Sequence, residues 1–361
     1  MHVQKDGPMT SLHRAAWPAL GAAILFGAST PFAKQLIGNG AGLPFPFLLA
    51  GLLYLGSGFG LTVTRLVRDR GWQPVGMPSI EWPWLLGAIA FGGVLGPLLL
   101  MVGLSRTTGA TASLFLNLES VLTAVLAWLV FKESTDRRIV LGMVLIVGGG
   151  AVLAWPTGET TASGLGPLAL AGACLAWAID NNLTRKVSAS DALFVAGSKG
   201  LVAGAVNTAL AFALGADWPA LQLLSTAMLI GFLGYGLSLV LFVLALRGLG
   251  TARTGAYFST APFVGAAISI LLFAEPTSAS FWIAAILMAA GVWLHLTEHH
   301  AHEHAHAELL HGHKHRHDEH HQHGHDFAWD GVDPHSHAHQ HVPLKHRHAH
   351  FPDIHHRHSH R

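Results

Sequence analysis

The chain has 361 residues, of which 51% are hydrophobic and 11% are charged, and its formal net charge is +1 with neutral histidines. This charged fraction is far below the roughly 25% that is usual in soluble domains, so the composition excludes an ordinary soluble protein and indicates a membrane protein. The balanced charge also argues against nucleic-acid binding. A single cysteine, Cys174, excludes a disulfide within the chain.

Ten apolar stretches follow one another along the chain, each near the length of about 20 residues that a bilayer core of ~30 Å requires. They are 15–37, 44–65, 82–104, 110–131, 139–155, 163–186, 191–213, 221–246, 252–273 and 279–297. The first stretch lacks a signal-peptide cleavage pattern, so it is expected to remain as a helix. The sequence therefore predicts an all-α integral membrane fold with ten transmembrane helices.

The basic residues between these stretches predict the orientation. If residues 1–14 are cytoplasmic, one basic loop residue, Arg106, is external, and all the others are cytoplasmic. The cytoplasmic ones are Lys5, Arg14, Arg65, Arg68, Arg70, Lys132, Arg137, Arg138, Arg185, Lys186, Arg247 and Arg253. This positive-inside bias predicts a multi-pass protein of the inner membrane with both termini, including residues 298–361, in the cytoplasm.

The membrane part also contains an internal repeat. Residues 103–155 and 245–297 align without gaps at an offset of 142, which places Glu133 on Glu275. Five helices per copy is an odd number, so the two copies must have opposite orientations, as in many secondary transporters. The predicted repeats are 15–155 and 163–297. Chance similarity between Leu-, Ala- and Gly-rich segments is the competing explanation.

Three segments carry a resemblance to a known family. They are Ala16-Trp17 through Pro31-Phe32, Asn117 through Trp128 with Phe131-Lys132-Glu133, and Ala261-Pro262-Phe263 with Ala274-Glu275-Pro276. Over residues 15–297 the chain resembles the EamA-type branch of the drug/metabolite transporter superfamily. The resemblance implies ten helices, both termini inside, a central cavity with alternating access, and amino acids, nucleotide sugars, drugs or other metabolites as cargo. Ser120, preceded by Glu119, departs from the Pro262 of the second copy.

Polar groups inside a bilayer are costly, and each is therefore a candidate for substrate or coupling-ion binding. The candidates are Asp180, Asn181, Asn182, Glu119, Asn117, Lys199, Lys34 and Tyr257. Lys199 is expected to pair with Glu119 or Asp180, and the alternative to a functional role is an ion pair that only holds helices together. Lys34 has the alternative of extending to the membrane interface, and Tyr257 that of simple packing.

The tail holds 24 of the 27 histidines, mostly as His-x-His and His-His. Imidazole suits Ni, Co and Zn ions, so we predict a metal-binding tail that is disordered when free of metal. The candidate ligands are His302, His304, His306, His311, His313, His315, His317, His320, His321, His323 and His325. A solvated segment that only buffers metal or protons is the alternative.

The sequence contains no enzyme signature and no phosphate-binding G-x-x-x-x-G-K motif, so the prediction is a secondary transporter rather than an enzyme. Two cargo hypotheses stay open. The first is a divalent transition metal or a metal-linked solute, and the second is an organic metabolite or drug with a regulatory or metal-storing tail. The expected partners are membrane lipids and a small-molecule or ion substrate, and a homodimer stays open. The spans require no cofactor.

Overall fold

The structure is a computed structural model of the chain. It describes residues 8–38, 44–75, 77–131, 137–155, 164–187, 190–249, 254, 257–297, 301–306, 309–315, 335–341 and 344–349. Contacts divide the chain into two compact units, one of which contains the helices and the other residues 299–352. Each unit is described by itself.

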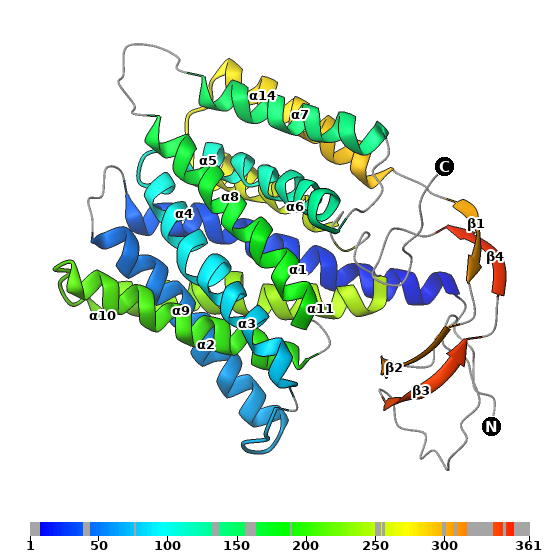
Figure 1. Cartoon of the computed structure of the whole chain (residues 1–361). Coiled ribbons are helices and arrows are strands. Elements are labelled where there is room, and N and C mark those ends of the chain that lie inside the picture. The colour runs from blue at the N-terminus through cyan, green and yellow to red at the C-terminus, as the bar shows by residue number, and fades with distance from the viewer. Residues whose placement is uncertain are drawn as a thin grey trace. The chain divides into compact units, whose positions relative to one another are not determined.

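The first unit is built from helices (Figure 1). In its first half these are α1 (Pro8–Ile37), α2 (Phe45–Arg68), η1 (Ser79–Glu81), α3 (Trp82–Ala88), η2 (Ile89–Leu95), α4 (Gly96–Leu104), α5 (Gly109–Phe115), α6 (Asn117–Phe131) and α7 (Arg137–Ala154). In its second half they are α8 (Leu165–Thr184), η3 (Arg185–Val187), α9 (Ala192–Ala213), α10 (Leu221–Gly231), η4 (Phe232–Leu237), α11 (Ser238–Leu249), α13 (Ala261–Phe273) and α14 (Ala279–Leu296). The elements η1 and η3 are 3₁₀ turns, whereas η2 and η4 are π-helical turns inside longer helices.

Each of the ten predicted spans overlaps a helix in the described part of the chain, although the span 252–273 includes residues outside that part. By length and composition, seven of these segments can cross a membrane. They are Trp17–Ile37, Phe45–Arg68, Ser79–Leu104, Gly109–Leu126, Ala192–Ala213, Leu221–Ala245 and Ala279–Leu296. Two shorter apolar helices are Arg138–Ala154 and Ala261–Phe273. A bilayer offers no hydrogen bonds to the backbone, and helices satisfy nearly all of theirs internally. The chain is therefore a multi-pass membrane protein.

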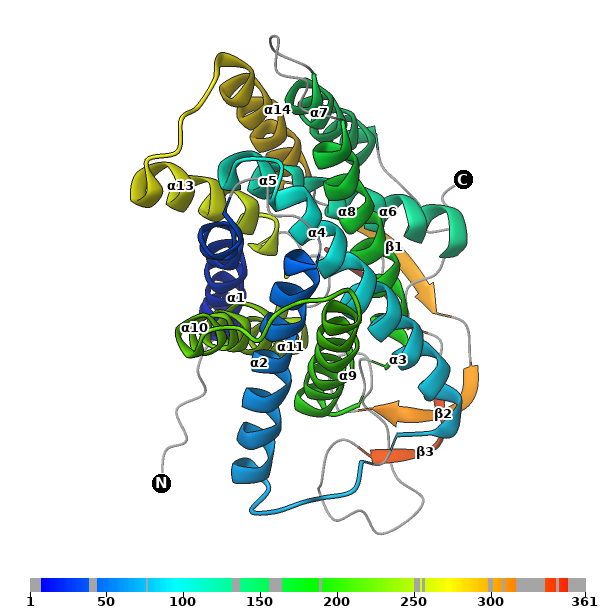
Figure 2. The ribbon, with the colours of Figure 1, turned by 90° about the vertical axis from the view of Figure 1, so that its left-hand side faces the viewer.

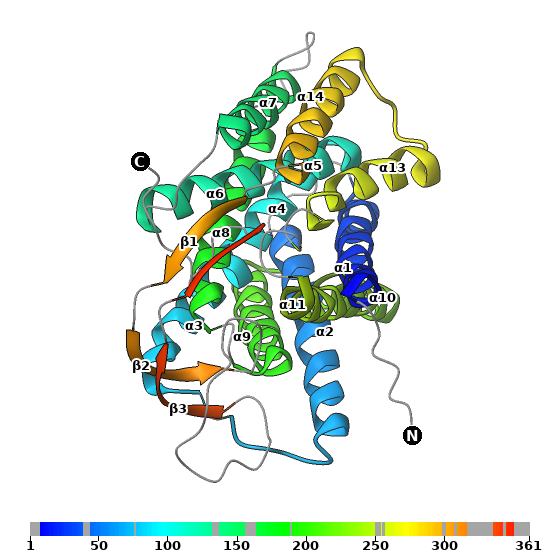
Figure 3. The ribbon, with the colours of Figure 1, turned by 90° about the vertical axis from the view of Figure 1, so that its right-hand side faces the viewer.

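Helices from the two halves of the chain pack against each other. The pair α2 and α9 crosses closely, α7 lies along α14 (Figure 2), and α1 packs against α11 and α13 (Figure 3). Glycine makes the first crossing close, because a Cβ at Gly200 would lie 2.5 Å from the backbone nitrogen of Gly58. Small residues at such crossings allow backbones to approach within a membrane.

Charged side chains link the end of α2 to the beginning of α9. Arg65 and Arg68 both bind the carboxylate of Asp191, at 3.2 and 2.5 Å, and Asp191 also caps α9 by accepting a hydrogen bond from the backbone nitrogen of Leu193. Arg68 donates to Asp69 as well, and this hydrogen bond lowers the pKa of the Asp69 carboxyl. These contacts fix the relative position of two helices that also form one wall of the cavity described below.

The second unit contains four strands, β1 (Ala301–His306), β2 (Leu309–His315), β3 (His335–His341) and β4 (Leu344–Ala349). They form two antiparallel pairs, β1 with β4 and β2 with β3, in registers that include His302 opposite His348 and His311 opposite His339. Alternation of histidine with another residue has the period of two that is typical of a strand. That the tail is disordered when free of metal stays a prediction. Of the predicted ligands, His317, His320, His321, His323 and His325 lie outside the described residues.

Candidate functional site

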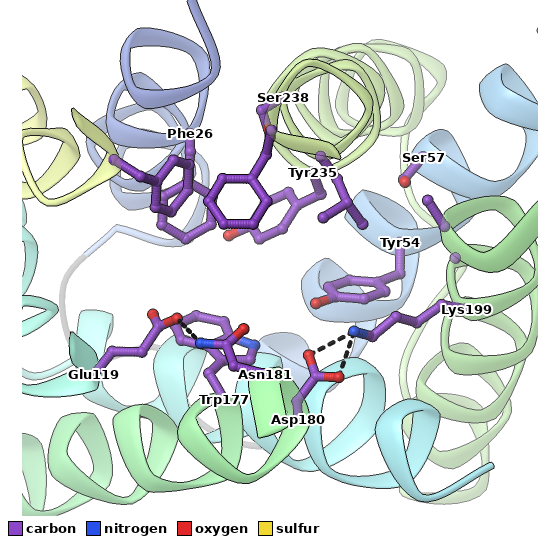
Figure 4. A pocket seen from close by; sticks show the side chains of 15 residues that line it. Phe26, Tyr54, Ser57, Glu119, Trp177, Asp180, Asn181, Lys199, Tyr235 and Ser238 are labelled. Atoms are coloured by element: carbon purple, nitrogen blue, oxygen red, sulfur yellow. Dashed lines mark hydrogen bonds and ion pairs between the residues drawn. The ribbon is translucent and has the colours of Figure 1, made fainter. Parts of the chain in front are cut away.

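A cavity of about 130 Å³ lies among α1, α2, α6, α8, α9, η4 and α11. Its walls combine aromatic rings with a few polar and charged groups (Figure 4). The lining residues are Phe26, Tyr54, Ser57, Glu119, Trp177, Asp180, Asn181, Ala196, Lys199, Gly200, Tyr235, Ser238, Leu239, Phe242 and Phe258. A mainly apolar hollow with a few converging polar groups is the usual form of a small-molecule site.

An ion pair crosses one end of this cavity. Lys199 on α9 donates to both carboxylate oxygens of Asp180 on α8, at 2.6 and 2.5 Å, and the two side chains are only 9% and 8% exposed. Thr184, one turn further along α8, donates to the same carboxylate at 2.9 Å. Of the two partners predicted for Lys199, Asp180 is the one observed.

The π-helical turn η2 provides the surface against which Asp180 lies. The Gly92 carbonyl accepts hydrogen bonds from the Tyr54 hydroxyl at 2.7 Å and from the Trp177 indole N–H at 3.0 Å. A Cβ at Gly92 would overlap the carboxylate of Asp180, so only glycine allows this approach. Asn207 on α9 donates to the next carbonyl, that of Gly93, at 3.2 Å. Such π-turns often occur at functional sites because they free backbone groups for other contacts.

Glu119 is the second carboxylate of the cavity. Its Oε1 accepts a hydrogen bond from the Asn181 side chain at 2.8 Å, and Asn181 also donates to the Thr123 hydroxyl at 3.3 Å. Asn181 is the one hydrogen-bond partner of the Glu119 carboxylate among the described residues. The lysine of the cavity is therefore bound to the other carboxylate, and Glu119 has no basic partner in this part of the chain.

Four of the eight predicted substrate or ion ligands line the cavity, namely Glu119, Asp180, Asn181 and Lys199. The other four do not. Asn182 donates to the Ala178 carbonyl at 2.8 Å, and Asn117 is buried and donates to the Leu114 carbonyl at 3.1 Å. Each also reaches another helix, since Asn182 donates to the Thr123 carbonyl of α6 at 3.4 Å and Asn117 to the sulfur of Met288 at 3.8 Å.

Lys34 and Tyr257 also lie away from the lining. The Lys34 ammonium donates to the carbonyls of Leu104 at 2.7 Å and Gly38 at 3.2 Å, where helices α4 and α1 end and leave carbonyls without helical partners. Tyr257 packs against Ala19 and Ala245, whereas the ring of its neighbour Phe258 lines the cavity.

The carboxylate of Glu275 has a structural role at the beginning of α5. It accepts hydrogen bonds from the backbone nitrogens of Gly109 at 3.0 Å and Ala110 at 2.8 Å, and it thereby caps the helix. Acidic groups at helix N-termini satisfy N–H groups that lack a helical partner and favour the helix dipole. Its counterpart in the repeat, Glu133, lies outside the described residues.

The sequence did not single out the aromatic lining or Asn207. In a membrane protein an aromatic residue inside a span carries no signal of its own, because every span is apolar. For Ser57 a signal was available in the sequence. The repeat offset of 142 places it on Lys199, which was a candidate, and both residues line the cavity.

Metal-ligand clusters are absent from the helical unit as far as its side chains are described, where no group of three or more His, Cys, Asp or Glu residues comes together. Glu119 and Asp180 are the two carboxylates of the cavity, and the second is bound to Lys199. The donor set of the cavity therefore does not fit a tightly held transition metal, which needs several nitrogen, sulfur or oxygen ligands at once.

Comparison with known proteins shows that both halves of the chain are similar to the same family. The sequence profile of the EamA-like transporter family matches residues 13–155 and again residues 164–297. Over 238 residues the chain is 28% identical to an "Uncharacterized transporter" of Methanothermobacter thermautotrophicus, covering 64% of this chain and 69% of that protein.

Other relatives are shorter. Over 111 residues the chain is 40% identical to the "Probable 4-amino-4-deoxy-L-arabinose-phosphoundecaprenol flippase subunit ArnE" of Pseudomonas aeruginosa, which covers 29% of this chain and 92% of that protein. A solved structure titled "Crystal structure of protein" matches with a TM-score of 0.59 and 18% identity, over 78% of this chain and 95% of that one. At this identity the match shows the fold alone. The relatives with a named role are a transporter and a flippase subunit rather than enzymes.

Proposed function

The chain belongs to the EamA-like transporter family, and from this we propose that it moves a small organic solute through the cavity between α1, α6, α8 and α9. The observation that carries the proposal is a hollow inside the membrane part whose walls hold a buried ion pair, a second carboxylate and aromatic rings. Charged groups are costly at this depth and mark substrate and ion pathways in other membrane proteins.

Of the two cargo hypotheses, the organic solute has the better support. A divalent metal would need several oxygen or nitrogen donors, whereas the Asp180 carboxylate is held by Lys199 and six of the fifteen lining residues are aromatic. An organic molecule can use both kinds of wall, because its apolar part contacts the rings and its polar part contacts Glu119, Asn181 or the ion pair. We assign substrate or ion contact to Glu119, Asp180, Asn181 and Lys199.

We propose ten spans arranged as two inverted repeats, 15–155 and 163–297. Three observations support this arrangement. Both halves match one family profile. The two π-helical turns, η2 at Ile89–Leu95 and η4 at Phe232–Leu237, occupy nearly equivalent places at the offset of 142. Gly58 and Gly200, which meet where α2 crosses α9, are separated by the same offset.

We further propose that both termini are cytoplasmic in an inner membrane. Arg70 and Arg106 are exposed and follow different spans, and Cys174 is buried. In a Cys174→Ala background, we expect a cysteine introduced by Arg106→Cys to react with a membrane-impermeant maleimide in intact cells. One introduced by Arg70→Cys should react only in inverted vesicles. Reaction of the Arg70→Cys variant in intact cells would contradict the orientation and the inverted repeat together.

Transport itself is tested with the purified protein in proteoliposomes. Vesicles with and without protein are incubated with a mixture of small metabolites, and mass spectrometry identifies solutes whose internal amount depends on the protein. We expect at least one organic solute to move, and no change in Ni, Co or Zn. Protein-dependent metal movement without any organic solute would return the preference to the metal hypothesis.

For the tail we propose metal binding, separate from the transport site. Each ion takes roughly four to six donors, so 24 histidines can hold several Ni, Co or Zn ions. Equilibrium dialysis of the full chain at neutral pH should show several bound ions, and a chain ending at Thr297 should lose most of them. Below about pH 6 binding should fall, because protonated imidazole has no free lone pair. Equal binding by both chains would contradict the proposal.

A further inference from the structure

Six aromatic rings form a continuous set around the cavity. The ring set consists of Phe26, Tyr54, Trp177, Tyr235, Phe242 and Phe258. Neighbouring ring centroids are 5.4 Å apart for Tyr54–Tyr235, 6.0 Å for Phe26–Tyr235, 6.2 Å for Phe26–Trp177, 5.2 Å for Phe26–Phe258 and 4.9 Å for Phe242–Phe258. The face of each ring carries partial negative charge, so a wall of this kind attracts cations as well as apolar groups.

The charged groups of the cavity do not cancel. Lys199 and Asp180 neutralise each other through two short hydrogen bonds, and Thr184 adds a third contact to the same carboxylate. Glu119 remains, and its partner is the neutral amide of Asn181. With Glu119 ionised, the charge of the lining is −1. Figure 4 shows Glu119 and the Asp180–Lys199 pair at separate places along the same wall.

This arrangement discriminates between classes of solute. An anion would be repelled by the carboxylate of Glu119, and it would find the ammonium of Lys199 already bound to Asp180. A zwitterion would have to open that pair to bind its carboxylate. A bare metal ion would exchange its water ligands for rings that cannot coordinate it. An organic ammonium ion meets none of these obstacles, because its charge can contact Glu119 while its carbon atoms contact the ring set.

The size of the cavity sets a further limit. Its volume of about 130 Å³ is close to that of an engineered apolar cavity of about 150 Å³ that holds benzene. In the described conformation a solute with one ring or a short branched chain fits within this volume.

We propose that the cargo is a small monovalent organic ammonium ion, bound by the Glu119 carboxylate and enclosed by the ring set. This inference rests on the proposed transport function and names the charge class of its substrate. Glu119 supplies the charge contact, the rings supply contact to the carbon skeleton, and the Asp180–Lys199 pair keeps the rest of the wall neutral.

The test compares three ligands of nearly equal size and different charge on the purified full chain, by competition against radiolabelled benzylamine at neutral pH. They are benzylamine, which is a cation, benzyl alcohol, which is neutral, and benzoate, which is an anion. We expect benzylamine to compete at least about tenfold more tightly than the other two, since one charge-assisted contact is of this order. Absence of benzylamine binding, or equal or tighter binding of benzyl alcohol or benzoate, would overturn the proposal.

Two variants identify the groups responsible. Glu119→Gln keeps the size of the side chain, and we expect it to remove most of the preference for benzylamine over benzyl alcohol. The matched control is Glu81→Gln, at a carboxylate outside the cavity that accepts a hydrogen bond from Ser190 at 3.0 Å, and it should leave the preference unchanged. Phe26→Leu should weaken benzylamine binding more than it weakens benzyl alcohol binding. An unchanged preference in folded Glu119→Gln protein contradicts the role of Glu119.

The outcomes also separate this inference from the transport function. If proteoliposomes move only neutral or anionic solutes, the proposed transport function is supported and the proposal of an organic ammonium ion as cargo is wrong. If benzylamine binds as expected while vesicles move no solute, the ligand class of the cavity stands and the proposed transport falls.

Discussion

Lys199→Met is expected to lower the stability of the protein by about 3–5 kcal/mol, because it leaves the buried Asp180 carboxylate without its cation. Asp180 is 8% exposed and, among the described residues, would retain only the hydrogen bond from the Thr184 hydroxyl. Thermal unfolding of the purified variant in detergent should show a clear fall in Tm, and transport in proteoliposomes should be lost. Asp180→Asn should also lower the stability, since it removes the carboxylate that the ammonium of Lys199 binds.

The double variant Asp180→Asn with Lys199→Met separates a structural role from a functional one. Neutralising both partners removes the unpaired charge, so we expect Tm to recover most of the loss. If the pair takes part in transport, the refolded double variant stays inactive. If the pair only holds α8 against α9, the double variant regains transport, and both residues leave the proposed site. Arg106→Met, at an exposed arginine, is the control for removal of a positive charge and should change neither quantity.

The spans could be predicted from the sequence because their signal is local. A run of about 20 apolar residues has few structural alternatives in a membrane, and in the described part of the chain seven of the ten predicted stretches contain a helix that is long and apolar enough to cross one. The cap formed by Glu275 was foreseeable for a related reason, since an acidic residue just after a span is more often a loop or cap group than a ligand.

The cavity was less predictable because it depends on which helices meet. The sequence identified Lys199 and two acidic candidates, but the choice of Asp180 follows from the packing of α8 beside α9 and from η2 behind the carboxylate. Gly92 is one of 41 glycines, and composition gives no reason to single it out. The prediction of Tyr257 as a lining candidate fell one residue from a ring that lines the cavity, Phe258, because the rotation of a helix about its axis cannot be fixed from a mainly apolar segment.

The π-turn η2 leads to a prediction at Gly92. Gly92→Ala adds a Cβ that would overlap the Asp180 carboxylate, so the carboxylate must move away from Lys199 or η2 must shift. Either response weakens the ion pair and displaces the Gly92 carbonyl, which accepts hydrogen bonds from Tyr54 and Trp177. We expect a loss of at least about 2 kcal/mol in stability from overpacking and disturbance of the pair, together with loss of transport.

The matched control for this substitution is Gly148→Ala in α7. A Cβ at Gly148 would have no atom within 4 Å, so the change adds no clash and removes the conformational freedom of a helical glycine. We expect its Tm to stay the same or rise, by up to about 1 kcal/mol in stability, with transport unchanged. Since the two substitutions add the same methyl group, a difference between them measures the close approach of Asp180 to η2. Equal Tm and equal transport in both variants would mean that this approach is not required, and the ion pair would then have to form without the support of η2.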